Sequence, residues 1–431
     1  VWFDAGSQRR GRLLLVCHHL AVDAVSWRLL LEDLQHIYQS LETGGVPPTA
    51  LEATTFADWS GALRRYAATP DVQGQLDYWL AQNAPALPVD HADGVNTEAT
   101  ARTIHLSLDR ETTTRLLGPA CATYRNRPDE LMLAALARTL CAWSGNSSVL
   151  VELEGHGRED FAGAPDVSRT AGWFTSLYPV RLTPDGDMAA SVAGIKEQLR
   201  RIPQKGIAYG LLRYLTARGV LLAQVPAPQV TFNYLGRVER EAAGGWMLAE
   251  EETGPSRAAA SPRRCWFDLT LMVRDGTLRI DWTYSDSVHS PATAEALARA
   301  FVGHMENIVA HCVGAPQARL TPSDVPLSGQ DQAALDALAL PASRVEDLYP
   351  LSPMQAGMLF HSQYQPGGAA YVNQLSVELS GLRVAPFAAA WRAALERHAV
   401  LRTAFVANAE PPLQWVARDA ALPLREVDLR A

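Results

Sequence analysis

The sharpest chemical signal in the sequence is the peptide HHLAVDAVSW at residues 18–27. Two adjacent histidines, His18 and His19, precede Asp23 and Ser26 where an apolar run gives way to a helical pattern. An imidazole has an unperturbed pKa of about 6.5, so modest tuning by its surroundings makes it a competent base at neutral pH. A lone histidine would favour a structural role. A histidine pair followed by an acid in a turn favours a positioned base.

A carboxylate is the second candidate group. Glu154 ends the alternating run VLVELE at residues 149–154 and is followed by the flexible Gly155–His156–Gly157. Glu152 lies on the same face of that predicted strand and competes for the same role. From the residues alone, a surface carboxylate or a partner of Arg158 remains the simpler interpretation of Glu154.

Metal and cofactor chemistry finds no support in the sequence. Adjacent histidines in a turn rarely chelate one ion, and no third ligand is spaced near them. The five cysteines are widely separated, odd in number and without a CxxC pair, which favours reduced thiols over disulfides or a zinc site. There is no P-loop and no GxGxxG motif for a nucleotide or redox cofactor.

Composition indicates an ordinary globular protein of two or three domains. The 431 residues are 48% hydrophobic and 19% charged, with a net charge of −8 spread along the chain. A basic face for nucleic acid or an anionic membrane is not expected. The apolar run after RRGR stops at the histidine pair, and no other run approaches the ~18 apolar residues that span a bilayer. We expect a soluble, cytoplasmic protein.

The hydrophobic patterns predict mixed helices and strands. Hairpin strands over residues 265–285 turn at Asp275–Gly276, a strong turn signal, and Ser290–Pro291 opens a helix that reaches Cys312. The apolar run at 13–17 predicts a buried strand, and other strands are predicted at 149–154, 229–236 and 371–379. Regular structure is expected to resume around residues 345–349. Other helices are predicted at 26–41, 56–67, 71–82, 109–118, 129–143 and 384–398. Residues 313–344 are rich in Pro, Gly, Ser and Asp, which is typical of an interdomain linker.

Several motifs, taken in order, resemble a known family. HHLAVDAVSW resembles the HHxxxDG motif of the condensation-domain superfamily, in the HHxxxDxxSW form of nonribosomal peptide synthetase epimerization domains. Further motifs similar to those of epimerization domains follow: DELMLAALARTL (129–140), EGHGRED (154–160), RTAGWFTSLYPVRL (169–182), IPQKGIAYGLLRYL (202–215) and FNYLG (232–236). The resemblance covers roughly residues 10–312. Ala24 and Ala208 depart from it where the family has Gly, and Ala171 where it has Val.

The resemblance implies a fold and a domain order. The fold is the α/β (α+β) fold of chloramphenicol acetyltransferase, two lobes in a V with the histidine turn at the tunnel between them. Because the family carries over a hundred residues before this motif, we expect a truncated first lobe that folds poorly and little activity from this fragment. VEDLYPLSPMQAGMLFHS (345–362) and RHAVLRTAF (397–405) resemble the start of a condensation domain. The expected domains are 1–312, a linker at 313–344, and 345–431.

The reaction implied is inversion, L to D, of the α-carbon of an aminoacyl or peptidyl thioester. The thioester arrives on the 4′-phosphopantetheine of a carrier protein, and no cofactor is bound directly. Removing a proton from one face and returning it to the other needs a proton-transfer group on each side. His19 and Glu154 match the family's catalytic histidine and glutamate.

Supporting roles follow from the same resemblance. Tyr234 and Asn233 match the FNYLG positions, and we prefer Tyr234 as the catalytic one because alternation points only one of them inward. Asp23 is expected to pair with Arg158 and hold the histidine turn, with His18 beside it. The amino end of the helix near Ser26 is expected to help stabilise the enolate. Ser26, Trp173 and Thr175 are candidates for the substrate channel.

The partners implied are an upstream peptidyl carrier protein domain and a downstream condensation domain of the same synthetase. Nucleic acid and membrane are not expected. Two alternatives stay open. One is condensation-type acyl transfer, with His19 as base for an attacking amine. The other is a non-catalytic docking fragment for a carrier protein.

Overall fold

The computed structural model describes residues 1–6, 10–46, 54–238, 241–242, 246–247, 249, 251, 253–255, 257–315, 318–364 and 371–428. The chain divides into two compact units. Unit 1 contains residues 1–117 and 128–309, and unit 2 contains residues 118–127 and 310–431. The expected boundary near residue 312 therefore lies close to the observed one, but unit 2 also takes in ten residues from within the first expected domain. Parts of the expected linker (316–317) and of the chain end (429–431) lie outside the described residues.

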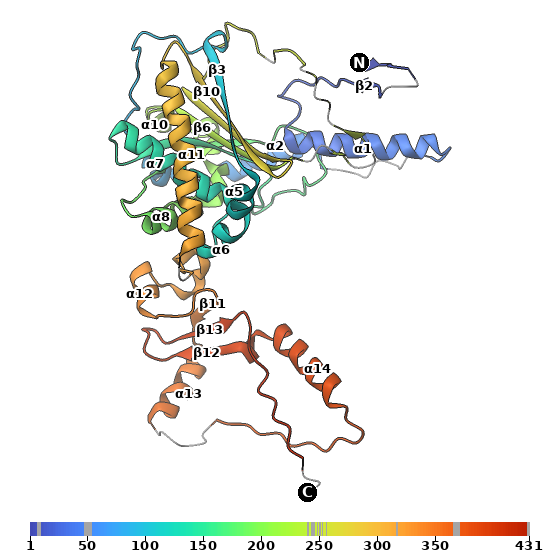
Figure 1. Ribbon diagram of the computed structural model, residues 1–431, viewed down its shortest axis with the longest axis vertical. Helices are drawn as coiled ribbons and strands as arrows, with labels where there is room; N and C mark the ends of the chain where they lie inside the picture. Colours follow the sequence, from blue (N-terminus) through green and yellow to red (C-terminus); the bar gives the residue numbers. More distant parts are fainter. Residues whose placement is uncertain are drawn as a thin grey trace. The chain divides into compact units, whose positions relative to one another are not determined.

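A six-stranded mixed sheet is the centre of unit 1 (Figure 1). Its spatial order is β3 (Ala101–Leu108), β10 (Thr277–Ser285), β9 (Phe267–Arg274), β6 (Val230–Arg237), β4 (Val149–Gly155) and β5 (Ser176–Leu182). β6 runs parallel to both β4 and β9, and the other pairs are antiparallel. The predicted hairpin is confirmed, since Asp275 and Gly276 both adopt the positive φ that its tight turn requires.

One face of this sheet is apolar and fully covered. Along β9 and β10 every second residue is buried, as in Leu269, Leu271, Ile280 and Trp282. Trp282 contacts Phe301 of helix α11 (Pro291–Gly314) at a ring-centroid distance of 5.8 Å.

Unit 1 has further helices after the first one. They are α2 (Phe56–Ala67), α3 (Pro70–Gln73), α4 (Leu76–Leu80), α5 (Arg110–Arg115), α7 (Pro128–Ser144), α8 (Met188–Arg200), α9 (Ile207–Leu215), α10 (Gly219–Leu222) and α11, whose last residues belong to unit 2.

The first 46 residues differ most from expectation. The apolar run at 13–17 was predicted to be a buried strand, but only Arg12–Leu13 is extended as β2, paired with β1 (Trp2–Phe3). Leu15 and Val16 are exposed. An apolar run becomes a buried strand only where a sheet covers it, and β1 is the one strand that pairs with it among the described residues. The prediction of a buried strand was therefore wrong.

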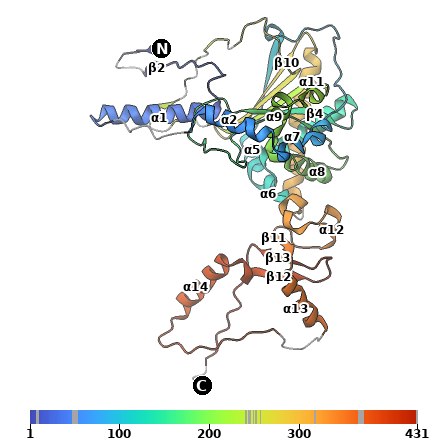
Figure 2. The same cartoon turned by 180° about the vertical axis from the view of Figure 1, so that it is seen from behind.

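Helix α1 (Ala24–Glu42) forms where predicted but carries its apolar side in the open. Leu34, Tyr38 and Leu41 are all exposed, and the helix projects from the sheet-containing body in both views (Figures 1 and 2). Asp23 and Ser26 tie its first turn to the body, and Arg169 pairs with Glu32 and Asp33 further along the helix. The two remaining short strands of unit 1 are β7 (Glu241–Ala242) and β8 (Trp246–Met247).

Unit 2 has a three-stranded antiparallel sheet with the centre strand last in sequence. The spatial order is β11 (Val345–Pro350), β13 (Leu413–Ala417) and β12 (Thr403–Val406). Residues 371–379, predicted to be a strand, are exposed and unpaired with any of these, so that prediction was wrong. The helices of unit 2 are α6 (Cys121–Tyr124), α12 (Gln332–Ala337), α13 (Pro353–Tyr364) and α14 (Val384–Arg397).

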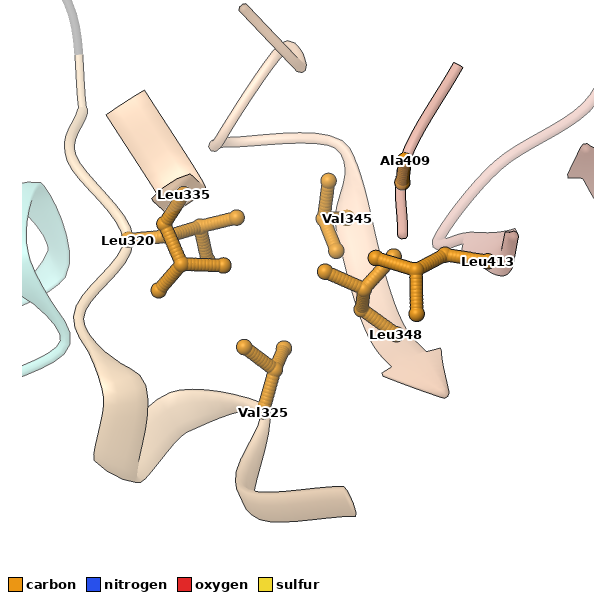
Figure 3. Close-up of a cluster of buried hydrophobic side chains, with 7 residues drawn as sticks. All are labelled: Leu320, Val325, Leu335, Val345, Leu348, Ala409 and Leu413. Atoms are coloured by element: carbon orange, nitrogen blue, oxygen red, sulfur yellow. The ribbon is translucent and has the colours of Figure 1, made fainter. Parts of the chain in front are cut away.

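The expected linker is largely folded into unit 2. Short turns at Pro322–Asp324 and Pro326–Ser328 lead into α12. Leu320, Val325 and Leu335 are buried in one cluster with residues of the sheet (Figure 3). The sequence suggested a linker because large apolar residues are sparse there, yet these three are spaced to reach a common core. Seven residues form the buried cluster: Leu320, Val325, Leu335, Val345, Leu348, Ala409 and Leu413.

Leu335→Ala is expected to destabilise unit 2 by about 2–5 kcal/mol, because it removes a buried side chain and leaves a cavity. Hydrogen exchange of the β11 and β13 amides measures the loss of protection. Leu327→Ala, at a position 66% exposed in the same segment, is the matched control and should change protection little. Equal effects of the two substitutions would show that residues 318–344 do not contribute to the core.

All five cysteines are free thiols, and three of them (Cys121, Cys265 and Cys312) are buried. Burial raises the pKa of Cys265 to about 11 and that of Cys312 to about 12, so these thiols stay protonated and unreactive. In the part of the chain that the structure describes, no helix has the length and hydropathy needed to cross a membrane.

Candidate active site

The histidine turn is fixed by Asp23, the N-cap of α1. One carboxyl oxygen of Asp23 accepts the Ser26 amide at 2.7 Å and the other accepts the Phe174 amide at 3.1 Å. The Asp23 amide donates to the carbonyl of Gly172 at 3.1 Å. Asp23 therefore both starts the helix and attaches the turn to residues 172–174, far away in sequence.

Ser26 completes this attachment. Its hydroxyl donates to the carbonyl of Gly172 at 2.8 Å and accepts the Gly172 amide at 3.0 Å. The side chain is fully buried. Ser26 was a candidate for the substrate channel, and this was wrong, because its hydroxyl is occupied by backbone and sealed from any channel.

Arg158 pairs with Asp23, as predicted. The distance between its Nη2 and the Asp23 carboxylate is 3.3 Å, and both side chains are more than nine-tenths buried. Arg158 also donates to the carbonyls of Val167 and Thr170 at 2.8 and 2.7 Å, and its guanidinium lies 3.8 Å from the centre of the Phe174 ring. Arg158 is thus committed to the histidine turn and is not the partner of Glu154.

The electrostatics of Asp23 fit an ionised carboxylate. Burial alone would raise its pKa, but hydrogen bonds from Ser26 and Phe174 and the charge of Arg158 outweigh burial and lower it. The amino end of α1 was expected to stabilise an enolate. The Ser26 amide there already donates to the Asp23 carboxylate, so this amide is not available to an enolate.

Gly157 lets the loop after β4 pass close to residues 172–174. It has a φ of +67°, and a Cβ at this position would lie 1.6 Å from the carbonyl oxygen of Phe174. No other residue fits this approach. Residues 172–174 lead directly into β5, whose first residue Ser176 pairs with Gly155 at the end of β4. The histidine turn, bonded to residues 172–174, is therefore placed at the end of β4.

His19 is exposed at this place and contacts Trp173. The ring centroids are 5.9 Å apart, with the planes at 56°. Trp173 is 40% exposed, whereas Phe174 is buried against Phe56 and Trp59. The two aromatic residues of GWFT therefore have separate roles: Phe174 packs the core, and Trp173 remains at the site beside His19. His18 is also exposed, and its Nδ1 accepts the Leu20 amide at 3.1 Å.

Glu154 lies at the exposed end of β4, on the face shared with Asn233. The Asn233 amide donates to the Glu154 carboxylate at 2.7 Å. Tyr234, the residue preferred from the sequence, lies by alternation on the opposite face with Phe232. Of the two FNYLG residues it is Asn233, not the preferred Tyr234, that contacts Glu154. A catalytic role for Tyr234 stays a prediction.

The competition between Glu152 and Glu154 is resolved by their surroundings. Glu152 is buried and ion-paired with Arg264, so it is not accessible to a substrate. Glu154 is accessible. Partial desolvation, followed by repulsion from Asp268 and Glu152, raises the pKa of Glu154, and the positive charge of His19 acts in the opposite direction. His19 and Glu154 are thus within electrostatic reach of each other.

Asp268 and Arg264 were missed by the sequence analysis. Asp268 stands on β9, in register with Thr231 of β6 and so on the face of Glu152 and Glu154. The sequence did contain a signal for this residue, because Asp268 is the one charged residue in the strand peptide WFDLTLMV.

Glu159 was also missed. It is buried and binds Lys205 and His156 at 2.9 and 3.1 Å, which ties the loop after Glu154 to the turn before α9.

Removal of the Asp268 charge is expected to lower the pKa of Glu154, since one of the two repelling carboxylates is lost. In Asp268→Asn, the limb of the pH–rate profile that reports Glu154 should move to lower pH. Glu111→Gln, an exposed carboxylate on α5, is the control and should leave that limb in place. A limb that stays or moves to higher pH in Asp268→Asn would contradict this electrostatic assignment.

The alanine substitutions in the family motifs cause no strain here. Ala24 is the first residue of α1 and Ala208 is fully buried inside α9. Neither is among the described residues with positive φ. Thr175, a channel candidate, is half-buried directly before β5. Among the described residues, no group of three or more His, Cys, Asp or Glu side chains is placed to hold a metal ion.

These features define a class of protein: an α/β domain with a histidine turn beside a carboxylate at the end of an inner strand of one mixed sheet. The condensation domain family matches residues 5–325 and 345–431. The chain belongs to the condensation domain family.

Similar proteins are peptide synthetases. One of the linear gramicidin synthases from Brevibacillus parabrevis is 40% identical over 100% of this chain, and chondramide synthase cmdD from Chondromyces crocatus is 36% identical over 98%. The chain spans 6% and 12% of the lengths of these two relatives.

Among solved structures, the epimerization domain from the third module of tyrocidine synthetase B is similar, with 34% identity and a TM-score of 0.63 over 69% of this chain and 68% of that one. The first condensation domain of the CDA synthetase has the same fold at 20% identity, with a TM-score of 0.52 over 69% of this chain and 64% of that one. The expected chloramphenicol acetyltransferase-like α/β fold and the resemblance to synthetase epimerization domains are confirmed.

Proposed function

We propose that the chain inverts the α-carbon, L to D, of an aminoacyl or peptidyl thioester held on the phosphopantetheine of a carrier protein. The observation that carries this proposal is that His19 and Glu154 are both exposed near the end of β4 and that the charge of His19 acts on the pKa of Glu154. Trp173 packs beside His19, and Asn233 donates a hydrogen bond to Glu154. The similarity to a solved epimerization domain supports the same conclusion.

In the proposed reaction, one of these groups removes the α-proton as a base and the other returns a proton to the opposite face as an acid. One C–H bond breaks and one forms, so the thioester is unchanged apart from its configuration. An enolate forms between the two steps. The raised pKa of Glu154 suits it to hold a proton for donation, and Asn233 fixes its carboxyl group. Trp173 packs beside the His19 ring and helps to hold it at the site.

The partners of this reaction are a carrier protein domain upstream and a condensation domain downstream in the same synthetase. The match of residues 345–431 to the condensation domain family supports the downstream partner. No cofactor is needed in this scheme beyond the phosphopantetheine that brings the substrate.

The experiment that tests the proposal measures the configuration of the carrier-bound thioester after incubation without any acceptor amine. A synthetase that contains this chain together with a carrier domain is loaded with the L-thioester, and the released acyl group is resolved by chiral chromatography. A mixture of L and D forms is expected. Retained L configuration, with product released only when an acceptor amine is added, would instead identify acyl transfer as the function.

A further inference from the structure

The open face of the six-stranded sheet carries an unbroken row of polar side chains that begins at the candidate site. From Glu154 the row continues through Asn233 on β6, Thr270 on β9, Asp281 on β10 and His105 on β3. The strand registers place these residues opposite one another: Asn233 pairs with Thr270, Thr270 with Asp281, and Asp281 with His105. The row therefore crosses five strands.

Contacts within the row keep its side chains in place. Asn233 donates to Glu154 at 2.7 Å, and at the far end His105 Nδ1 lies 2.7 Å from the Asp281 carboxylate. A parallel row beside it is also polar, with the hydroxyls of Thr103 and Thr283 2.9 Å apart. By contrast, Leu269 and Trp282 on the other face of the same strands are completely buried.

The far end of the row opens into a hollow. This cavity has a volume of about 540 Å³ and belongs entirely to unit 1. His105 and Asp281 line it together with Ser107, Met272 and Arg279. The row thus connects the candidate site to a separate space on the same sheet face.

The chemistry of this face suits a peptide rather than a packed protein element. Hydroxyl, amide and carboxylate groups can pair with the N–H and C=O groups of a peptide backbone, which must be satisfied when they leave water. A helix or second sheet packed on this face would have to bury the Asp281 carboxylate, whose side chain is 40% exposed, at high cost.

The length of the row also points to a peptide. Adjacent strands are about 4.8 Å apart, so the four steps from β4 to β3 span roughly 19 Å. An extended peptide rises about 3.3 Å per residue, so about five or six residues fit this distance. A single aminoacyl group at Glu154 would leave most of the row unused.

We infer that this row binds the peptide part of a peptidyl thioester, so that the substrate class of the site is peptidyl rather than aminoacyl. This inference rests on the proposed function, because it takes from it that the α-carbon that reacts lies beside Glu154. The growing peptide lies across β6, β9 and β10 with its backbone paired to Asn233, Thr270 and Asp281, and its amino end reaches the hollow beside His105.

The test compares binding with turnover. Thioether analogues of aminoacyl-pantetheine and pentapeptidyl-pantetheine are titrated calorimetrically against a synthetase that contains this chain, and α-inversion of the two corresponding thioesters is measured separately. The peptidyl analogue is expected to bind at least tenfold more tightly. The double variant Thr270→Val/Asp281→Ala should reduce this ratio to near one. The matched control Thr183→Val/Asp185→Ala, in the loop after β5, should keep the ratio of the unchanged protein.

Equal affinities for the two analogues, or a ratio unaffected by Thr270→Val/Asp281→Ala, would overturn the inference. The rate of α-inversion distinguishes failure of this inference from failure of the proposed function. If the peptidyl analogue binds preferentially but neither thioester is inverted, the row stands as a peptide site and the epimerization proposal fails. If both thioesters are inverted at equal efficiency with equal affinity, the epimerization proposal stands and the row is not the peptide site.

Discussion

His19→Ala and Glu154→Gln are each expected to reduce net inversion of the carrier-bound thioester by about 10²–10⁴-fold, the usual contribution of a general acid or base. Each variant removes one of the two groups needed to take a proton from one face and return it to the other. Both positions are exposed, so little stability should be lost. The measurement is the initial rate at which the D form appears from the L-thioester.

Matched controls for this prediction lie on the surface away from the site. His36→Ala on α1 and Glu295→Gln on α11 change the same residue types at exposed positions and should invert at the unchanged rate. If His19→Ala and Glu154→Gln also inverted at that rate, the assignment of the two proton-transfer groups would be wrong.

Asp23→Ala is expected to lower the free energy of unfolding of unit 1 by about 3–5 kcal/mol and to abolish inversion as well. The substitution leaves the Arg158 charge buried without its carboxylate and removes the N-cap of α1. The effect is measured by denaturant unfolding followed through a probe in unit 1. Asp33→Ala is the matched control, because Asp33 pairs with Arg169 on the exposed side of α1 and such pairs contribute about 1 kcal/mol or less.

The same pair predicts a pH dependence of stability. The pKa of Asp23 is lower in the folded chain than in the unfolded chain, so its contribution is complete above the unfolded pKa and is lost as the pH falls through the folded pKa. In acid the difference in stability between the unchanged protein and Asp23→Ala should therefore shrink. A difference that stays constant down to acid pH would show that the ion pair is not its source.

Much of the site could be predicted from local sequence, because its signals are local. The helix start at Asp23, the strand ending at Glu154 and the turn at Asp275–Gly276 each depend on residues adjacent in the chain. The pairing of Asp23 with Arg158 was expected from the motifs and is present. The first three predictions succeeded because adjacent residues determine them, whereas the Asp23–Arg158 pair, 135 residues apart, was expected only from the family motifs.

The predictions that failed depended on what covers a residue from elsewhere in the chain. Ser26 looked accessible from its place in a turn, but Gly172, 146 residues further on, occupies its hydroxyl. The apolar residues 13–17 were expected in a buried strand, but the described elements leave most of these side chains exposed. Leu320 and Leu335 looked like parts of a linker because their core partners, Val345 and Leu413, lie further along the chain. Such tertiary contacts leave no periodic signal in the segment itself.

The measurement that tests the central claim most directly is the exchange of the α-proton with deuterated solvent, starting separately from the L- and the D-thioester. If His19 and Glu154 serve opposite faces of the α-carbon, His19→Ala should lose exchange from one isomer and Glu154→Gln from the other, while each retains some exchange from the remaining isomer. Loss of exchange from the same isomer in both variants, or normal exchange from both isomers, would contradict the account.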